Sequence, residues 1–420
     1  MKKGIFWMIA VGLVFFFGLM LNRAPAAEPV KIAAHGEFTG KSSPYGMGVL
    51  QAVRFEVKKK NEAGGIKSLG GAKIELIEED NASQPKDAVA SHERLASNKE
   101  ILAIVGPTLT PQATPVEPIA GKYRITSIFP ITTTDSVFEN KNKYVFSTTI
   151  MGSRIGEGYA RFMLDMHKKY KVPLNRITYS YPDTEYGINV GRSFKAVLKG
   201  AGFEKNIVLD LPFDSNLKDL TPVVLKLKAA NPDFHCQVGY FADGKLFHDA
   251  CFNLKFNPLQ VGGANGFNHP DLWKVLGARI AEETIGSKKT FFLDTACFDL
   301  PNPARDSWIK SFSTENPKVP VEQNLLLGAE SIRLLLEAME AAGKRDREAI
   351  AEAMHKMNFQ KDDSRDIMGN FEKPGLAFGP DGKPNTWGFI SQWDKKGDNL
   401  GKLSVYHPGM GWISGPKMFK

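Results

Sequence analysis

Two clusters of threonine hydroxyls stand directly after short apolar runs of this sequence. Thr108 and Thr110 follow Ile101–Val105, and a run of three threonines at 132–134 follows the apolar residues 125–129. Short apolar runs bounded by Gly or Pro are typical of buried strands. Hydroxyls and the backbone N–H groups of loops suit an anionic group such as a carboxylate. The two loops therefore predict half of a small-molecule site.

Aromatic and polar residues stand at the same kind of position later in the chain. Asp183 and Tyr186 come after the strand-like run 177–181, and Tyr240 and Asn265 come after two later runs. Tyrosine rings supply apolar walls that end in a polar tip. Each of these residues alone would be an ordinary loop residue. Their shared position after strands favours a second half of the same site.

The sequence lacks the common enzyme motifs. It contains no G-x-x-x-x-G-K-[ST], no H-E-x-x-H and no G-x-S-x-G pattern. The eight histidines have no ligand-like spacing, and the three cysteines form no C-x-x-C pair. We therefore expect a binding protein without cofactor or metal. An exported enzyme on the same framework is a less favoured alternative.

The elements that must position these residues alternate along the chain. Strand-like runs alternate with helical stretches, which indicates parallel sheets covered on both faces. The alternation runs twice within 420 residues, more than one hydrophobic core usually serves, so two α/β lobes are expected. Near the predicted site, the pattern predicts helices over 111–120, 189–201 and 245–254. In such sheets, small ligands bind beyond the carboxyl ends of the strands.

The N-terminus has the layout of a secretory signal peptide. Lys2 and Lys3 precede an apolar run at 5–21, and an Ala-Pro-Ala site follows at 24–26. An uncleaved anchor helix is the alternative, because the run lies just under the length that spans a bilayer. The small-residue site favours cleavage near Ala26 and export.

Charge and cysteine usage limit which other kinds of function the chain could have. The formal net charge is +8, but the basic residues are scattered apart from a short run at 58–60. Nucleic-acid binding is not expected, because a clustered basic stripe is missing.

Cys236, Cys251 and Cys297 allow three disulfide pairings, each of which leaves one thiol free. Buried unpaired thiols are the simpler interpretation, and the pairing stays open.

Six short motifs follow one another along the chain. They are Phe-Thr-Gly at 38–40, Tyr-Gly at 45–46, Asn-Glu-Ala-Gly-Gly-Ile at 61–66, Val-Gly-Pro-Thr at 105–108, Tyr-Gly at 186–187 and Val-Gly-Tyr at 238–240. In their order and spacing, over nearly the whole mature chain, they resemble the periplasmic solute-binding proteins of ABC importers, in the leucine/isoleucine/valine-binding family.

The resemblance implies the type I periplasmic binding fold, with two Rossmann-like α/β lobes of parallel sheets joined by a three-crossing hinge. After a signal peptide at 1–26, lobe 1 would comprise 27–148 and 294–386, and lobe 2 would comprise 149–293 and 387–420. A small ligand is caught between the lobes, and the closed form docks on an ABC permease in the inner membrane. We expect a periplasmic monomer. A sensor that presents its closed form to a membrane signalling partner is the alternative.

The resemblance also implies ligand contacts in the first lobe. Tyr45 would wall the pocket. Thr110 and Thr133 would hold the ligand carboxylate, together with the backbone near Ile131. Thr108 stands in the same loop as Thr110 and completes the predicted set.

In the second lobe, the resemblance implies contacts from Tyr186 and Tyr240. Asn265 departs from the family pattern, because branched-chain amino-acid binders carry an acidic residue there for the ligand ammonium. An amide cannot neutralise a charge, and Asp183 and Asp243 are the acids left to do so. The ligand therefore stays open between a branched-chain amino acid, an amide, urea and an aromatic acid.

Overall fold

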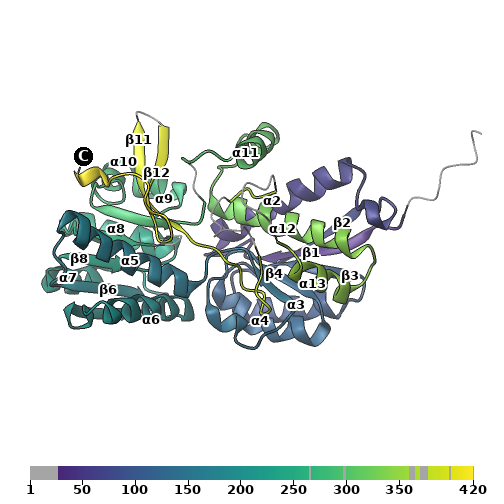
Figure 1. Ribbon diagram of the computed structural model, residues 1–420, viewed down its shortest axis with the longest axis horizontal. Helices are drawn as coiled ribbons and strands as arrows, with labels where there is room; N and C mark the ends of the chain where they lie inside the picture. The colour runs from purple at the N-terminus through teal and green to yellow at the C-terminus, as the bar shows by residue number, and fades with distance from the viewer. Residues whose placement is uncertain are drawn as a thin grey trace, which may run out of the picture.

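The computed structural model describes residues 27–263, 266–296, 299–358, 365–368, 377–396 and 399–419. Its elements form two α/β lobes that lie side by side (Figure 1). The predicted signal peptide at 1–26, Asn265 and Cys297 lie outside the described residues. Within the described ranges, no helix has both the length and the apolar character needed to cross a membrane.

Lobe 1 is built on a parallel five-stranded sheet with the order β2-β1-β3-β4-β5. Helices α2 and α12 share a core with one face of this sheet, and α3 and α4 share a core with the other. The strands are β1 Val30–Gly36, β2 Ile74–Asp80, β3 Ile101–Val105, β4 Thr126–Phe129 and β5 Val145–Ser147. The helices are α2 Ser43–Glu62, α3 Pro85–Ser97, α4 Thr110–Tyr123, α11 Pro303–Glu315, α12 Gln323–Ala342 and α13 Arg347–His355.

Lobe 2 is built on an eight-stranded sheet with the order β13-β12-β11-β10-β9-β8-β6-β7. Strands β6 to β10 pair in parallel, and the C-terminal strands add to β10 as an antiparallel extension. The strands are β6 Ile177–Pro182, β7 Ile207–Phe213, β8 Phe234–Gln237, β9 Gln260–Gly262, β10 Thr290–Asp294, β11 Phe389–Lys396, β12 Asn399–His407 and β13 Gly411–Trp412. The helices are α5 Gly152–Tyr170, α6 Glu185–Gly200, α7 Thr221–Ala230, α8 Phe241–Asn253, α9 Pro270–Leu276 and α10 Ala278–Glu283.

The chain passes between the two sheets three times. It leaves lobe 1 between β5 and α5, returns between β10 and α11, and crosses again before β11. Helix α11 belongs to lobe 1, because Trp308 and Phe312 pack against Phe55 of α2. This arrangement confirms the predicted two-lobed α/β fold with a three-crossing hinge, whereas the residue boundaries of the lobes stay a prediction.

The helices nearest the predicted site begin earlier than the apolar pattern indicated. Helix α6 begins at Glu185 instead of 189, and α8 begins at Phe241 instead of 245. Thr184 caps α6, because its side chain accepts a hydrogen bond from the N–H of Gly187. The first turns are polar and aromatic, so apolar periodicity starts only after them. Tyr186 therefore lies in the first turn of a helix and not in a loop.

Candidate ligand-binding site

The first-lobe threonines form the start of the site. Thr110 is the first residue of α4, and Thr133 lies in the loop after β4. Their exposed fractions are 4% and 7%. Within the described part of the chain, neither hydroxyl makes a hydrogen bond, although the Thr133 carbonyl accepts one from the N–H of Gly152 at 2.5 Å. Both hydroxyls therefore remain available to a bound group, and Thr110 stands at the positive end of the α4 dipole.

Thr108 has a different role, because its hydroxyl donates to the buried carboxylate of Glu37. The Thr108 carbonyl accepts a hydrogen bond from the Thr132 hydroxyl at 3.0 Å. The side-chain amide of Asn81 also donates to Glu37, at 3.3 Å. Burial raises the pKa of the Glu37 carboxyl. Glu37 thus ties together the loops that follow β1, β2 and β3, one of which leads to Thr110.

Sequence reasoning missed Glu37, although one signal was present. Glu37 follows directly on β1, whose seven residues include five in succession that are buried. An acid immediately after such a strand stands at the same edge of the sheet as the threonine loops. Ile131, by contrast, places its side chain in the lobe 1 core, so that any contact with a ligand would come from its backbone.

Two tyrosines of lobe 2 form a ring pair. The ring centroids of Tyr186 and Tyr240 are 5.3 Å apart, and the ring planes are inclined by 46°. The Tyr240 hydroxyl lies 3.4 Å from the hydroxyl of Thr184. Tyr240 packs against the apolar cores of both lobes, which places it at the boundary between them. The ring pair thus offers an apolar wall where the lobes meet.

The two predicted acids of lobe 2 differ in their surroundings. Asp243 is buried in the first turn of α8, where its Oδ2 accepts a hydrogen bond from the N–H of Tyr240 at 2.9 Å. Burial raises the pKa of Asp243 to about 6. Asp183 is exposed, and its N–H donates to the carbonyl of Phe213 at 2.8 Å. Of these two acids, only Asp243 is buried beside the ring pair, and Asn265 lies outside the described residues.

The two halves of the site meet where the lobes contact each other. Helix α4 of lobe 1 contacts α6 of lobe 2. The N–H of Phe241, at the start of α8, donates to the hydroxyl of Tyr45 in α2. The Thr134 hydroxyl donates to the carboxylate of Glu185 at 3.3 Å. Helix starts from both lobes therefore meet at the boundary between the lobes.

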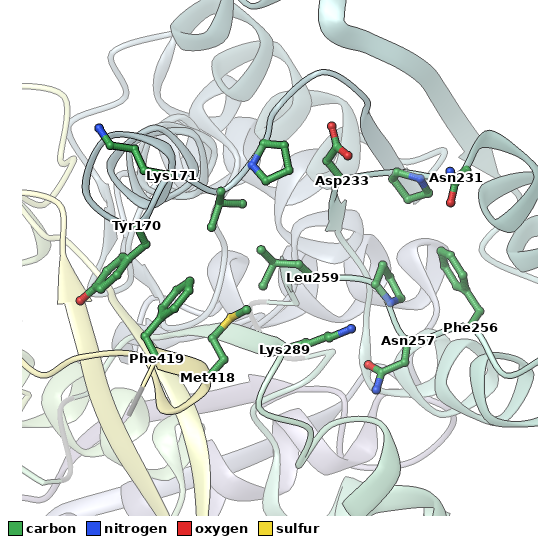
Figure 2. A pocket seen from close by; sticks show the side chains of 14 residues that line it. Tyr170, Lys171, Asn231, Asp233, Phe256, Asn257, Leu259, Lys289, Met418 and Phe419 are labelled. Atoms are coloured by element: carbon green, nitrogen blue, oxygen red, sulfur yellow. The ribbon is translucent and has the colours of Figure 1, made fainter.

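A separate cavity of about 550 Å³ lies elsewhere in lobe 2. Tyr170, Leu259, Lys289 and Phe419 line it, and the side chains of Tyr170 and Phe419 lie next to each other in Figure 2. Its lining segments precede β6, β8, β9 and β10, so the cavity lies at the amino ends of the strands. None of the predicted ligand contacts lines it.

Within the described ranges, no group of three or more His, Cys, Asp or Glu side chains is arranged to hold a metal ion. Cys236 and Cys251 are buried and free. Burial raises the pKa of both thiols, which disfavours the reactive thiolate.

The sequence model of the periplasmic binding protein family matches residues 29–398. The chain belongs to this family. A Leu/Ile/Val-binding protein homolog 7 of Brucella melitensis is 23% identical over 81% of this periplasmic binding protein and 84% of the relative. The leucine-, isoleucine-, valine-, threonine- and alanine-binding protein of Pseudomonas aeruginosa is 22% identical over 86% and 91%. These relatives are solute-binding proteins and not enzymes, in agreement with the sequence-based expectation.

Solved structures share the fold of this periplasmic binding protein. The branched-chain amino acid transporter substrate binding protein LivJ of Streptococcus pneumoniae, in complex with isoleucine, has a TM-score of 0.74 and 19% identity, over 90% of this chain and 100% of that chain. A solute binding protein of an ABC transporter from Rhodopseudomonas palustris, in complex with 3,4-dihydroxybenzoic acid, has a TM-score of 0.73 and 19% identity, over 91% and 99%. Proteins of this fold thus bind chemically different ligands.

Proposed function

We propose that this protein is the exported substrate-binding component of an ABC importer. It captures a small carboxylate-bearing or amino-acid-like solute between its lobes and delivers the solute to a membrane permease. The observation that supports this best is the pair of hydroxyls on Thr110 and Thr133, which make no hydrogen bond within the described residues. Thr110 begins α4, Thr133 lies in the loop after β4, and Tyr240 of the ring pair packs where the two lobes meet.

The proposed ligand group is a carboxylate, because the first-lobe half of the site is built from neutral donors. Hydroxyls and the orphan N–H groups at a helix N-terminus bind an anion without a cationic side chain. Isoleucine and 3,4-dihydroxybenzoic acid, the ligands of two structural neighbours, both contain a carboxylic acid. The shared group supports a common anion site, with the remainder of the ligand against the tyrosines.

Asp243 is the buried acid beside the ring pair that could pair with the amino group of a ligand. One oxygen of this carboxylate already accepts the Tyr240 N–H, and burial raises its pKa to about 6. At pH 7 this carboxyl is still mostly ionised, so its other oxygen stays available to an amino group. Isoleucine and 3,4-dihydroxybenzoic acid share a carboxylic acid but not an amino group, and we therefore propose that the carboxylate is the required part of the ligand.

A thermal-shift screen of ligand-stripped protein tests this proposal. The screen compares each acid with its uncharged amide, leucine with leucinamide and benzoate with benzamide, and includes urea. A tight ligand raises the melting temperature by mass action, and we expect that effect from a carboxylate and not from its amide. Equal shifts for an acid and its amide contradict the assignment of the anion site.

Two substitutions test the two halves of the site. We expect Thr133→Ala to weaken ligand binding about 10-fold or more, because hydrogen bonds to charged groups contribute about 1.5–3 kcal/mol. Tyr186→Ala should also weaken binding, because it removes half of the ring pair. Isothermal titration calorimetry measures both affinities. Thr314→Ala, on the exposed part of α11, is the control, and unchanged affinity in both site variants would overturn the assignment.

Export and the membrane partner have their own tests. We propose that the chain is cleaved near Ala26 and acts as a monomer in the periplasm, and N-terminal mass spectrometry of secreted protein reads the cleavage site. In proteoliposomes, the ligand-loaded protein should stimulate ATP hydrolysis by its cognate permease complex. A ligand-dependent response of a membrane receptor, without such stimulation, would favour the sensor alternative.

A further inference from the structure

Tyr45 connects the two lobes directly. Its side chain is 2% exposed in the first turn of α2, and its hydroxyl oxygen accepts the hydrogen bond from the Phe241 N–H of lobe 2. We propose that Tyr45 is a positioning residue that holds the start of α8 against lobe 1 and so favours the closed arrangement before any ligand binds. This role differs from that of a pocket wall, which needs the ring but not the hydroxyl.

The start of α8 explains why such a contact forms. The first N–H groups of a helix have no acceptor within the helix. Asp243 of the same lobe accepts the Tyr240 N–H at 2.9 Å, whereas the next N–H, that of Phe241, finds its acceptor in the other lobe. Separation of the lobes would move the Tyr45 hydroxyl away from this donor, and the Phe241 N–H would then hydrogen-bond to water.

Apolar packing follows the same path across the boundary. The Phe241 side chain packs against the lobe 1 core that contains Tyr45 and Ile131, and it also packs against a core of lobe 2. Tyr240 makes the same double contact. These two aromatic rings therefore bury surface against both lobes. Opening of the lobes would expose part of that surface to water, so the packing favours closure.

A further contact joins the two lobes at an exposed position. The Lys41 Nζ, in the loop before α2, donates to the Asn216 side-chain oxygen of lobe 2 at 3.2 Å. Lys41 is exposed, so this contact adds little energy. The buried hydroxyl of Tyr45 is therefore the more effective of these two polar links.

The same hydroxyl can also connect closure to the ligand. Its oxygen accepts the Phe241 N–H, and within the described residues its own proton has no acceptor. The Phe241 N–H that it accepts directly follows Tyr240, and Asp243 stands in the same turn of α8, so the hydroxyl belongs to the candidate site. A carboxylate bound between the lobes would be a suitable acceptor. This last step rests on the proposed function, whereas the contact between the lobes does not.

Tyr45→Phe separates the two roles, because it keeps the ring and removes the hydroxyl. Tyr123→Phe is the matched control, since its hydroxyl bonds to Glu93 within lobe 1. Spin labels at Lys99→Cys in lobe 1 and Lys226→Cys in lobe 2, both exposed positions, report the distance between the lobes by pulsed electron paramagnetic resonance. The measurement uses ligand-free protein and thus needs no knowledge of the ligand.

We expect the ligand-free protein to populate the closed distance and Tyr45→Phe to lower the closed-to-open ratio about two- to tenfold, the usual effect of one hydrogen bond. The control should match the unsubstituted protein. An unchanged distance distribution in Tyr45→Phe, or no closed population in the unsubstituted protein, overturns the proposal. Once a ligand is known, its dissociation rate should rise in Tyr45→Phe. If no ligand is found, the proposed function fails, and the ligand-free measurement still decides the role of Tyr45.

Discussion

Thr108 and Thr110 illustrate how two residues of one type acquire different roles two positions apart. The Thr108 hydroxyl is bonded to Glu37, which is 71 residues away in sequence, whereas the Thr110 hydroxyl has no such bond within the described residues. Sequence alone predicted both as ligand contacts. It could not separate them, because the acceptor of Thr108 comes close only when β1 and β3 pair in the sheet.

The buried carboxyl of Glu37 should stabilise lobe 1 through its two hydrogen bonds. Glu37→Ala removes the acceptor of the Thr108 hydroxyl and the Asn81 amide, which leaves buried donors unsatisfied. We expect a loss of about 2 kcal/mol or more in the free energy of unfolding, measured by denaturant titration. Ligand affinity should also fall, since the loop that leads to Thr110 loses its support.

Glu75→Ala provides the comparison for Glu37, because Glu75 is an exposed acid on β2 of the same lobe. It should change the free energy of unfolding by less than about 0.5 kcal/mol. If both alanine variants had the same stability and affinity, Glu37 would not organise the three loops as described.

At the scale of elements, α5 and α6 of lobe 2 lie so close that Gly156 has no room for a side chain. A Cβ at Gly156 would lie 2.1 Å from the Val190 carbonyl oxygen and 2.7 Å from the Phe194 nitrogen. Both are backbone atoms, so neither can rotate away. We expect Gly156→Ala to force the helices apart and lower the free energy of unfolding by about 1–3 kcal/mol, read by thermal or denaturant melts.

A second glycine on the same helix pair supplies the contrast. Gly200 ends α6, and a Cβ there would meet nothing within 4 Å. Gly200→Ala should leave stability unchanged or raise it by up to about 1 kcal/mol, because alanine favours the helix. Equal effects of the two substitutions would show that close helix packing at Gly156 is unimportant.

The positions of the helix starts show what the apolar pattern could not predict. The pattern located α6 and α8 but began each of them four residues late. The omitted turns contain Tyr186, which pairs with the Tyr240 ring, and Asp243, which caps the start of its helix. Periodicity reports the face that packs on a helix's own sheet, and a first turn at the cleft does not follow that pattern.

For the molecule as a whole, buried carboxyls should make stability depend on pH. Burial raises the pKa of Glu330, inside α12, to about 8 from an ordinary value of 4.5. Between these values the folded protein holds a proton that the unfolded chain has released, so the free energy of unfolding falls as the pH rises through this range. One pKa unit corresponds to about 1.4 kcal/mol, so this site contributes a few kcal/mol.

We expect Glu330→Gln to make the free energy of unfolding fall less steeply as the pH rises. The variant should be more stable than the unsubstituted protein at pH 8 and closer to it at pH 5, as measured by urea unfolding across pH. Glu322, with its pKa raised to about 7 by burial, maintains a slope of the same sign in the variant. Glu337→Gln, at an exposed position of α12, should follow the unsubstituted protein. A decline of the same steepness in Glu330→Gln would contradict the prediction.

The amino-acid order by itself determined the α/β class, the two lobes and most strands, because alternating apolar runs and polar loops reflect local periodicity. Motif order was also enough to indicate the family. Tertiary structure decided which residues of the predicted site act together. It assigned Thr108 to Glu37, left Asp183 exposed, buried Asp243 beside the ring pair and joined Tyr45 to α8. The contacts of Thr108 and Tyr45 join different elements or lobes, and apolar periodicity within one segment contains no information about such a partner.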